Sequence, residues 1–160
     1  MGVLAEELGV NRVTLYRWFG SRDDFIVEVV WSLALRTFDY VATKVSSEGA
    51  ERVVDMVTGF LDTIINNPGL GRWLAEDGEH AMRLLTGRRT TFQRRLIGAV
   101  QELLEDDTHG ALELPVDTHE LAYVIVRLIE SYTYLDLITG EEPDAKRAEP
   151  ILRMLLRVDS

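Results

Sequence analysis

The sequence contains no cysteine, only four prolines and only three histidines among its 160 residues. The absence of cysteine excludes disulfide bonds and thiolate metal sites, and it fits a reducing cytosol. No stretch approaches the roughly 20 apolar residues of a membrane-spanning helix, and no basic segment leads into an apolar run at the N-terminus. We therefore predict a cytoplasmic protein with no membrane segment and no signal peptide.

Positive charge is also scarce, because 17 lysines and arginines face 27 acidic residues for a net charge of −10. Residues 1–22 differ, since they hold three arginines and two glutamates, whereas residues 23–160 hold 14 basic and 25 acidic residues. An acidic body with a slightly basic tip suits a protein that presents one end to DNA. It equally suits an ordinary acidic protein, so charge alone does not decide.

The hydrophobic pattern predicts helices throughout, without the alternation of a β-hairpin. Gly9 is suited to a left-handed helix end, and Asn11 is the expected N-cap of a short helix over about 12–19. Ser21 with Asp24 forms a capping box at the start of a long helix over about 22–45. The chain is therefore expected to be all-α, with a small head at residues 1–22 and a helical body at residues 23–160.

The body should contain five more helices, separated by short glycine-, proline- and asparagine-containing breaks. Asp117 with Glu120 is a second capping-box candidate, Gly140 closes the helix that follows, and Pro143 opens the last one. The expected ranges are about 53–64, 70–85, 88–105, 118–139 and 143–158.

Two short helices around Gly9 indicate a helix-turn-helix, whose second helix exposes side chains suited to a DNA major groove. Hydroxyls and arginines on this helix can bind phosphate oxygens, and residues near its start can reach base edges. The alternative is a plain helical hairpin with a polar second helix. The candidate DNA contacts are Asn11, Arg12, Val13, Thr14, Tyr16, Arg17 and Arg22.

The run Thr14-Leu15-Tyr16-Arg17-Trp18-Phe19-Gly20-Ser21-Arg22-Asp23, preceded by Gly9-Val10, resembles the helix-turn-helix signature of TetR-family repressors. Arg22 stands where the family usually has lysine, which keeps the charge and changes its geometry. Within the family, residues 10–18 most resemble regulators of lactone quorum-signal degradation, the QsdR type. Family members have a further helix before Val3, so we expect this 160-residue form to bind DNA poorly without it.

The resemblance implies a small-molecule cavity in the body. Arg127, Glu130 and Tyr134 fall on one face of a very apolar helix, with Tyr123 one turn earlier. A buried Arg–Glu pair could orient an effector, and an internal or cross-dimer salt bridge is the alternative. Aromatic residues are wall candidates or simply core. The candidate effector contacts are Trp73, Phe92, Tyr123, Arg127, Glu130 and Tyr134.

No pattern predicts a metal, a cofactor or catalysis. His80, His109 and His119 lack the spacing of known metal motifs, and no nucleophile stands with a base. The densest basic cluster is either a solvated face or a site for an acidic effector, and it comprises Arg88, Arg89, Arg94 and Arg95. The sequence thus predicts a DNA-binding regulator and no enzyme.

The expected mechanism is ligand-biased binding to double-stranded operator DNA. The resemblance implies a homodimer through the helices at about 118–139 and 143–158, which would set two recognition helices roughly 34–36 Å apart. An effector that prefers another spacing would release the operator, with the helix over 22–45 as the mechanical link. The alternative is a helical interaction or dimerisation module that does not bind DNA in this form.

Overall fold

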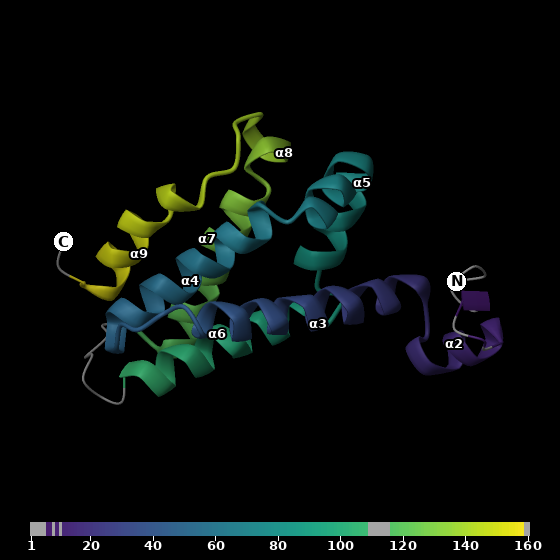
Figure 1. Cartoon of the computed structure of the whole chain (residues 1–160), viewed down its shortest axis with the longest axis horizontal. Helices are drawn as coiled ribbons and strands as arrows, with labels where there is room; N and C mark the ends of the chain where they lie inside the picture. The colour runs from purple at the N-terminus through teal and green to yellow at the C-terminus, as the bar shows by residue number, and fades with distance from the viewer. Residues whose placement is uncertain (1–5, 8, 10, 109–115, 159–160) are drawn as a thin grey trace.

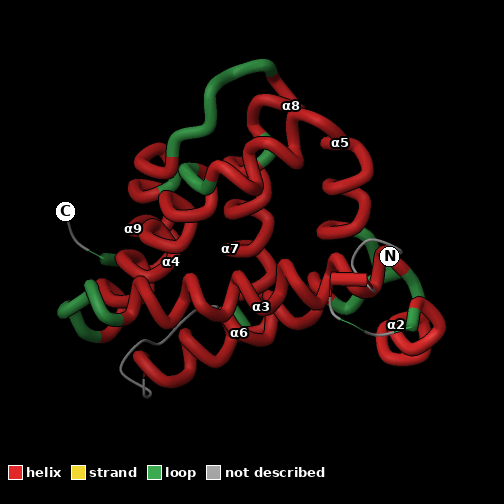
Figure 2. The backbone as a smooth tube through the Cα atoms, turned by 45° about the vertical axis from the view of Figure 1, so that its right-hand side comes forward, coloured by secondary structure: helices red, strands yellow, loops and turns green. Residues whose placement is uncertain are grey.

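The computed structural model describes residues 6–7, 9, 11–108 and 116–158, and over these residues it contains helices and loops but no strand (Figure 2). This confirms the predicted all-α fold. The side chains of residues 12, 107 and 108 lie outside the described part. The elements are α2 (Arg12–Phe19), α3 (Arg22–Ala42), α4 (Gly49–Ile65), α5 (Pro68–Thr86), α6 (Phe92–Thr108), α7 (Thr118–Thr133), α8 (Leu135–Thr139), the 3-10 helix η1 (Ala145–Arg147) and α9 (Glu149–Leu156).

The long helix α3 joins the N-terminal end of the molecule to the body. In Figure 1, α2 stands beyond one end of α3, away from α4 and α9, while the rest of α3 lies along the body. The predicted capping box fixes this junction, because the Asp24 amide donates to Ser21 Oγ at 3.0 Å and the Ser21 amide donates to Asp24 Oδ2 at 3.1 Å. Both bonds satisfy amides that a helix start leaves unpaired.

Helix α4 is the centre of the hydrophobic core, where it packs against α3, α6, α7 and α9. Its inward face is apolar at helical spacing, and Val53, Val57 and Leu61 are fully buried. Phe60 stacks on Phe38 of α3 with the ring centroids 4.2 Å apart. The position of α3 is thus set by the same helix that organises the body.

Helix α5 is kinked in the middle, where Asp77 has non-helical backbone angles of φ −149° and ψ 47°. The next residue is Gly78, and a Cβ atom there would lie 2.9 Å from Leu137 Cδ1 of α8. Glycine therefore allows α8 to approach α5 closely at the kink. The first half of α5 and its second half consequently contact different parts of the body.

The two helices predicted nearest the C-terminus are wrong as single helices. The first is divided into α7 and α8 at Tyr134, which has φ −105° and ψ 20°, and Gly140 closes α8 with φ 76° as predicted. The second begins at Glu149 rather than at Pro143, and η1 precedes it. Pro150 supplies no amide for a helix that continues from η1, so it occupies the first turn of a new one.

Helix α9 is fastened to α4 by an arginine on its outer turn. The two terminal nitrogens of Arg153 donate to the Glu51 carboxylate at 2.9 and 2.5 Å, and Arg153 Nε donates to Glu149 at 3.1 Å. The hydrogen bonds from Arg153 hold the pKa of Glu51 below its ordinary value.

Within the described ranges, no helix is both long enough and apolar enough to cross a membrane.

Candidate functional site

Helix α2 is positioned by one cap and two apolar anchors. Asn11 Oδ1 accepts a hydrogen bond from the Val13 amide at 2.8 Å, as predicted for an N-cap. Leu15 is completely buried, and the ring of Phe19 meets Phe25 of α3 edge-on with centroids 4.9 Å apart. These contacts fix one face of α2 against α3 and leave its other face outward. The apolar pattern also predicts that residues 4, 5 and 8 pack against residue 10, Leu15 and Phe19. That part of the contact lies outside the residues that the structure describes.

The outward face of α2 carries the predicted DNA contacts. Val13 is 71% exposed and Tyr16 is 37% exposed, and the Arg17 side chain is also exposed. Thr14 is partly buried. The free backbone amides at the N-terminus of α2 place the positive end of the helix dipole at this surface. A groove-sized helix with a hydroxyl and a guanidinium outward has the shape and chemistry of a phosphate-contacting element.

Two predicted contacts flank this surface. Arg22, the first residue of α3, is exposed next to the break that ends α2. Arg12 is the first residue of α2, and its side chain belongs to those outside the described part. Asn11 is exposed, but its side-chain oxygen is engaged by the helix cap. Of the predicted set, the structure therefore brings Val13, Tyr16 and Arg17 together on the exposed face.

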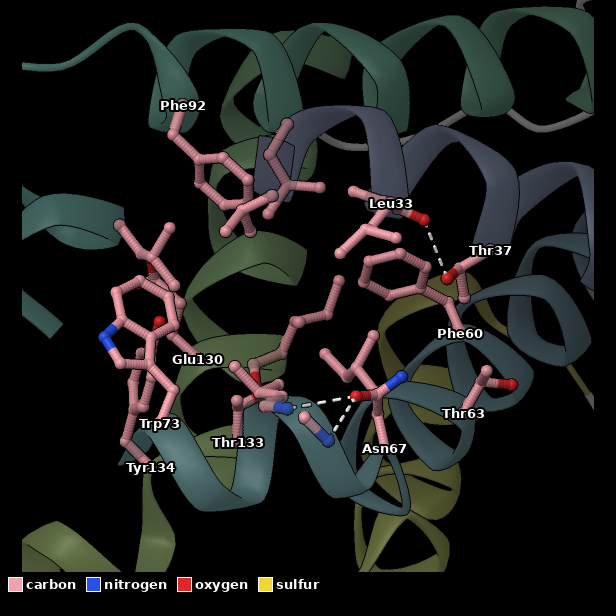
Figure 3. A pocket seen from close by; sticks show the side chains of 18 residues that line it. Leu33, Thr37, Phe60, Thr63, Asn67, Trp73, Phe92, Glu130, Thr133 and Tyr134 are labelled. Carbon is pink, nitrogen blue, oxygen red and sulfur yellow. Dashed lines mark hydrogen bonds between the residues drawn. The ribbon is translucent and has the colours of Figure 1, made fainter. Parts of the chain in front are cut away.

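The body contains a cavity of about 330 Å³, within the range of small-molecule sites. Its mouth lies between α3 and the α4–α5 turn, where Leu33 and Asn67 are exposed, and its floor consists of buried residues of α6 and α7. Figure 3 shows Trp73, Tyr134 and Glu130 on one side and Phe60, Thr63 and Asn67 on the other. The lining residues are Val30, Leu33, Ala34, Thr37, Phe60, Thr63, Ile64, Asn67, Gly69, Leu70, Trp73, Leu85, Phe92, Leu96, Ile129, Glu130, Thr133 and Tyr134.

A charged network closes the floor of this cavity. Arg127 lies 2.8 Å from Glu130 Oε2, and Gln93 of α6 bridges the pair by donating to Glu130 and accepting from Arg127. Gln93 also donates to the Leu85 carbonyl at 2.8 Å. Burial raises the pKa of Glu130 to about 7, although Arg127 and Gln93 both act to lower it. The desolvation of this carboxyl is therefore only partly offset by its partners.

Four of the six predicted effector residues line the cavity: Trp73, Phe92, Glu130 and Tyr134. Arg127 and Tyr123 do not belong to the lining, and Arg127 instead extends over the Tyr123 ring at 5.2 Å from its centroid. The predicted Arg–Glu pairing is present, and it is internal to α7. Burial and the nearby Glu130 carboxylate raise the pKa of Tyr134 well above its ordinary value.

Sequence reasoning missed the contribution of α3 and of the α4–α5 turn to this cavity. In the sequence, nothing distinguishes the lining residues of α3 and α4 from the other residues of an amphipathic helix. These lining residues are Leu33 and Thr37 of α3 and Thr63 of α4. Asn67 was recognised only as part of a helix break. Two signals were available: the aromatic residues Trp73 and Phe92, and the polar pair on α7, because unpaired polar groups inside an apolar helix are costly.

The second half of α5 contacts the start of α3. His80 Nε2 lies 3.3 Å from Asp23 Oδ1, and the Arg83 guanidinium lies 3.1 Å from His80 Nδ1. A guanidinium can only donate, so Nδ1 of His80 is the acceptor in its contact with Arg83. The first half of α5 supplies Trp73 to the cavity. One helix thus touches both the cavity and the junction with α2.

The four arginines of the basic cluster predicted after α5 differ in their surroundings, because one of them forms an ion pair and the other three are exposed to solvent. Arg95 binds Glu28 of α3 at 2.8 Å and lies over the Trp31 ring at 5.8 Å from its centroid. The other three arginines of the cluster are exposed and do not line the cavity. No group of three or more metal-binding side chains gathers anywhere in the described ranges, and His109 falls outside them.

The comparisons with known proteins agree with this architecture. Residues 48–157 match the family described as the tetracyclin repressor-like C-terminal domain, and the chain therefore belongs to the TetR family. The family prediction made from the helix-turn-helix motif is confirmed, and the fold is that of a transcriptional regulator.

The chain also resembles a solved structure, that of the R. erythropolis transcriptional repressor QsdR from the TetR family. The TM-score is 0.87 and the sequences are 23% identical, over 99% of this chain and 85% of that one. At this identity the likeness shows a shared fold. No curated protein matches the chain in sequence.

Proposed function

We propose that this protein is a sequence-specific DNA-binding repressor. It releases its operator when a small molecule occupies the body cavity. The observation that carries the DNA-binding part is the outward face of α2, where Tyr16 and Arg17 remain exposed while Leu15 anchors the opposite face. Family membership supports it independently. Because such a protein acts on chromosomal DNA, we also propose a cytoplasmic location.

DNA binding can be tested with the full-length gene product and duplexes selected from a random pool. We expect Tyr16→Phe and Arg17→Ala to weaken binding to the selected duplex without unfolding the protein, because both side chains face outward. Arg36→Ala is the matched control, since Arg36 is exposed in the second half of α3. Binding should also fall steeply with salt. Binding indifferent to salt and sequence would instead favour a helical interaction module.

We propose that the protein is a homodimer through α7, α8 and α9, the elements that replace the two helices predicted at 118–139 and 143–158. All three elements expose large apolar side chains, which in a monomer would remain in water. These are Tyr123 and Val124 on α7, Leu137 and Ile138 on α8, and Met154 on α9.

The association state of two charge variants tests this interface. Met154 is 70% exposed on α9, so Met154→Glu should dissociate the dimer without disturbing the core. Leu35→Glu is the control, because Leu35 is similarly apolar but lies exposed on α3. Sedimentation velocity at equal protein concentration measures the result. A dimer that survives Met154→Glu and dissociates with Leu35→Glu would move the interface to α3.

The effector part of the proposal rests on two helices that touch both the cavity and the head. Helix α3 begins beside α2 and supplies Leu33 and Thr37 to the cavity mouth. Helix α5 supplies Trp73 to the cavity and places His80 against Asp23 in the first turn of α3. A ligand that prefers one arrangement of these helices shifts the population of head positions.

The cysteine-free sequence allows this coupling to be measured with one introduced label. Trp18→Cys places a spin label on the exposed side of α2, and the dimer then carries two labels. We expect a compound that binds the cavity to change the inter-label distance and to lower DNA affinity together. Leu33→Trp, which narrows the mouth, should abolish both responses while DNA binding remains. A bound compound that changes neither quantity would contradict the proposal.

A further inference from the structure

The cavity lining offers few free hydrogen-bonding groups. The hydroxyls of Thr37, Thr63 and Thr133 all donate to the carbonyl four residues earlier in their own helix, at 2.9, 2.8 and 2.7 Å. Their protons are therefore unavailable to a ligand, and their methyl groups add to the apolar wall. Asn67 holds the start of α5 with its side-chain oxygen and lies at the exposed mouth. The interior is mainly a surface for apolar groups.

Tyr134 is the exception on the cavity floor. It is 4% exposed, it lines the cavity, and its hydroxyl makes no hydrogen bond with any residue that the structure describes. A hydroxyl that lines the cavity and makes no bond to the protein can donate to an acceptor atom of a ligand. In Figure 3, Tyr134 is drawn on the same side of the cavity as Trp73 and Glu130. The floor thus presents one proton donor within an apolar enclosure.

The charge of the lining argues against an anionic ligand. None of the described residues that line the cavity is a lysine, an arginine or a histidine, and the only ionisable carboxyl among them is Glu130. A ligand carboxylate would lose its hydration and face this carboxyl without a cation to pair with.

A cationic ligand is disfavoured for a different reason. Glu130 already pairs with Arg127 through one oxygen and accepts from Gln93 through the other. A ligand cation would have to compete with Arg127 for the same carboxylate after losing its own hydration. The floor network therefore leaves no uncompensated negative charge for such a ligand.

We infer that the cavity selects a neutral, mainly apolar molecule with one hydrogen-bond acceptor, such as a carbonyl or ether oxygen, which binds the Tyr134 hydroxyl. The inference rests on the proposed effector site and adds the chemical class of its ligand. The cavity of about 330 Å³ lies at the lower end of the range for small-molecule sites, so the ligand should be small.

Three probes with equal numbers of non-hydrogen atoms test the class: decan-2-one, nonanoate and decylammonium. Binding to the full-length dimer is measured by calorimetry. We expect decan-2-one to bind most tightly and nonanoate to bind more than about 100-fold more weakly, because its charge stays unpaired. Nonanoate binding should improve as the pH falls below about 7, when Glu130 takes up a proton. Tighter binding of either ion, or no binding of decan-2-one, overturns the inference.

A pair of tyrosine variants tests the donor. Tyr134→Phe should weaken decan-2-one binding about 3- to 10-fold, the value of one neutral hydrogen bond. Tyr132→Phe is the control, because the Tyr132 hydroxyl donates to the Arg147 carbonyl outside the cavity at 3.2 Å. An equal affinity for both variants excludes Tyr134 as the donor.

The same experiment separates this inference from the proposed function. If decan-2-one binds as expected but DNA affinity and head spacing do not change, the ligand class stands and the effector mechanism fails. If nonanoate or decylammonium binds more tightly and releases the DNA, the effector mechanism stands and the ligand class is wrong.

Discussion

Replacing Glu130 by glutamine should reduce the pH dependence of folding stability. Burial raises the pKa of Glu130 from its ordinary 4.5 to about 7 in the folded chain, whereas unfolding exposes the carboxyl to water. The folded state therefore binds the proton more tightly than the unfolded state. Stability falls as the pH rises through the window from 4.5 to about 7, and it levels off above that window.

The magnitude follows from the size of the pKa shift. A pKa difference of one corresponds to about 1.4 kcal/mol, so the native protein should lose about 2–3 kcal/mol relative to Glu130→Gln between about pH 5 and pH 8. An arginine side chain stays protonated throughout this pH range. The loss of the partner of Arg127 therefore changes the free energy of unfolding by the same amount at every pH. The prediction therefore concerns the change with pH and not the stability of the variant at one pH.

Urea unfolding followed by circular dichroism measures this difference at about pH 5, 6, 7 and 8, with protein concentration held fixed because association adds to stability. Glu102→Gln is the control, since it makes the same substitution at a carboxylate that is exposed on α6. A constant difference between native protein and Glu130→Gln would refute the reasoning. So would a difference that grows as the pH falls.

Four further substitutions test the packing and the capping of the helices. A Cβ atom at Gly59 would lie 2.8 Å from Val41 Cγ1, so Gly59→Ala should lower the free energy of unfolding by about 1–2 kcal/mol. Gly98 has open space around it, so Gly98→Ala should raise the free energy of unfolding by about 0.5–1 kcal/mol in the same urea assay. Asn11→Ala should destabilise α2 by about 1 kcal/mol through loss of the cap, seen as faster amide hydrogen exchange in α2 alone. Leu15→Ala should have a larger effect on the same amides because Leu15 is fully buried, and unchanged exchange would contradict its role as the anchor.

The parts of the fold that the sequence predicted are those with local causes. Asn11, Ser21 and Asp24 act within one turn of their own positions, so the ends of α2 and the start of α3 follow from residue type alone. The division near the C-terminus did not follow, because Pro143 and Pro150 both suit a helix start and only the packing of η1 against α4 selects the second.

The sequence predicted cavity residues on α7 and one aromatic lining residue each on α5 and α6, namely Trp73 and Phe92. Glu130 lies three residues after Arg127, so their pairing follows from helical spacing. Gln93 bridges the pair from α6, and Leu33 and Thr37 reach the cavity from α3. These contacts depend on how separate helices rotate and cross, which the periodicity of one helix does not determine.

A footprint on the selected duplex tests the central claim most directly, namely that the outward face of α2 reads DNA. For the full-length dimer, we predict two protected major-groove windows whose centres lie about 10–10.5 base pairs apart. Arg36→Ala should retain both windows, and the double substitution Tyr16→Phe with Arg17→Ala should lose both. Protection that persists in the double variant, or a protein that protects no window at all, would contradict the account.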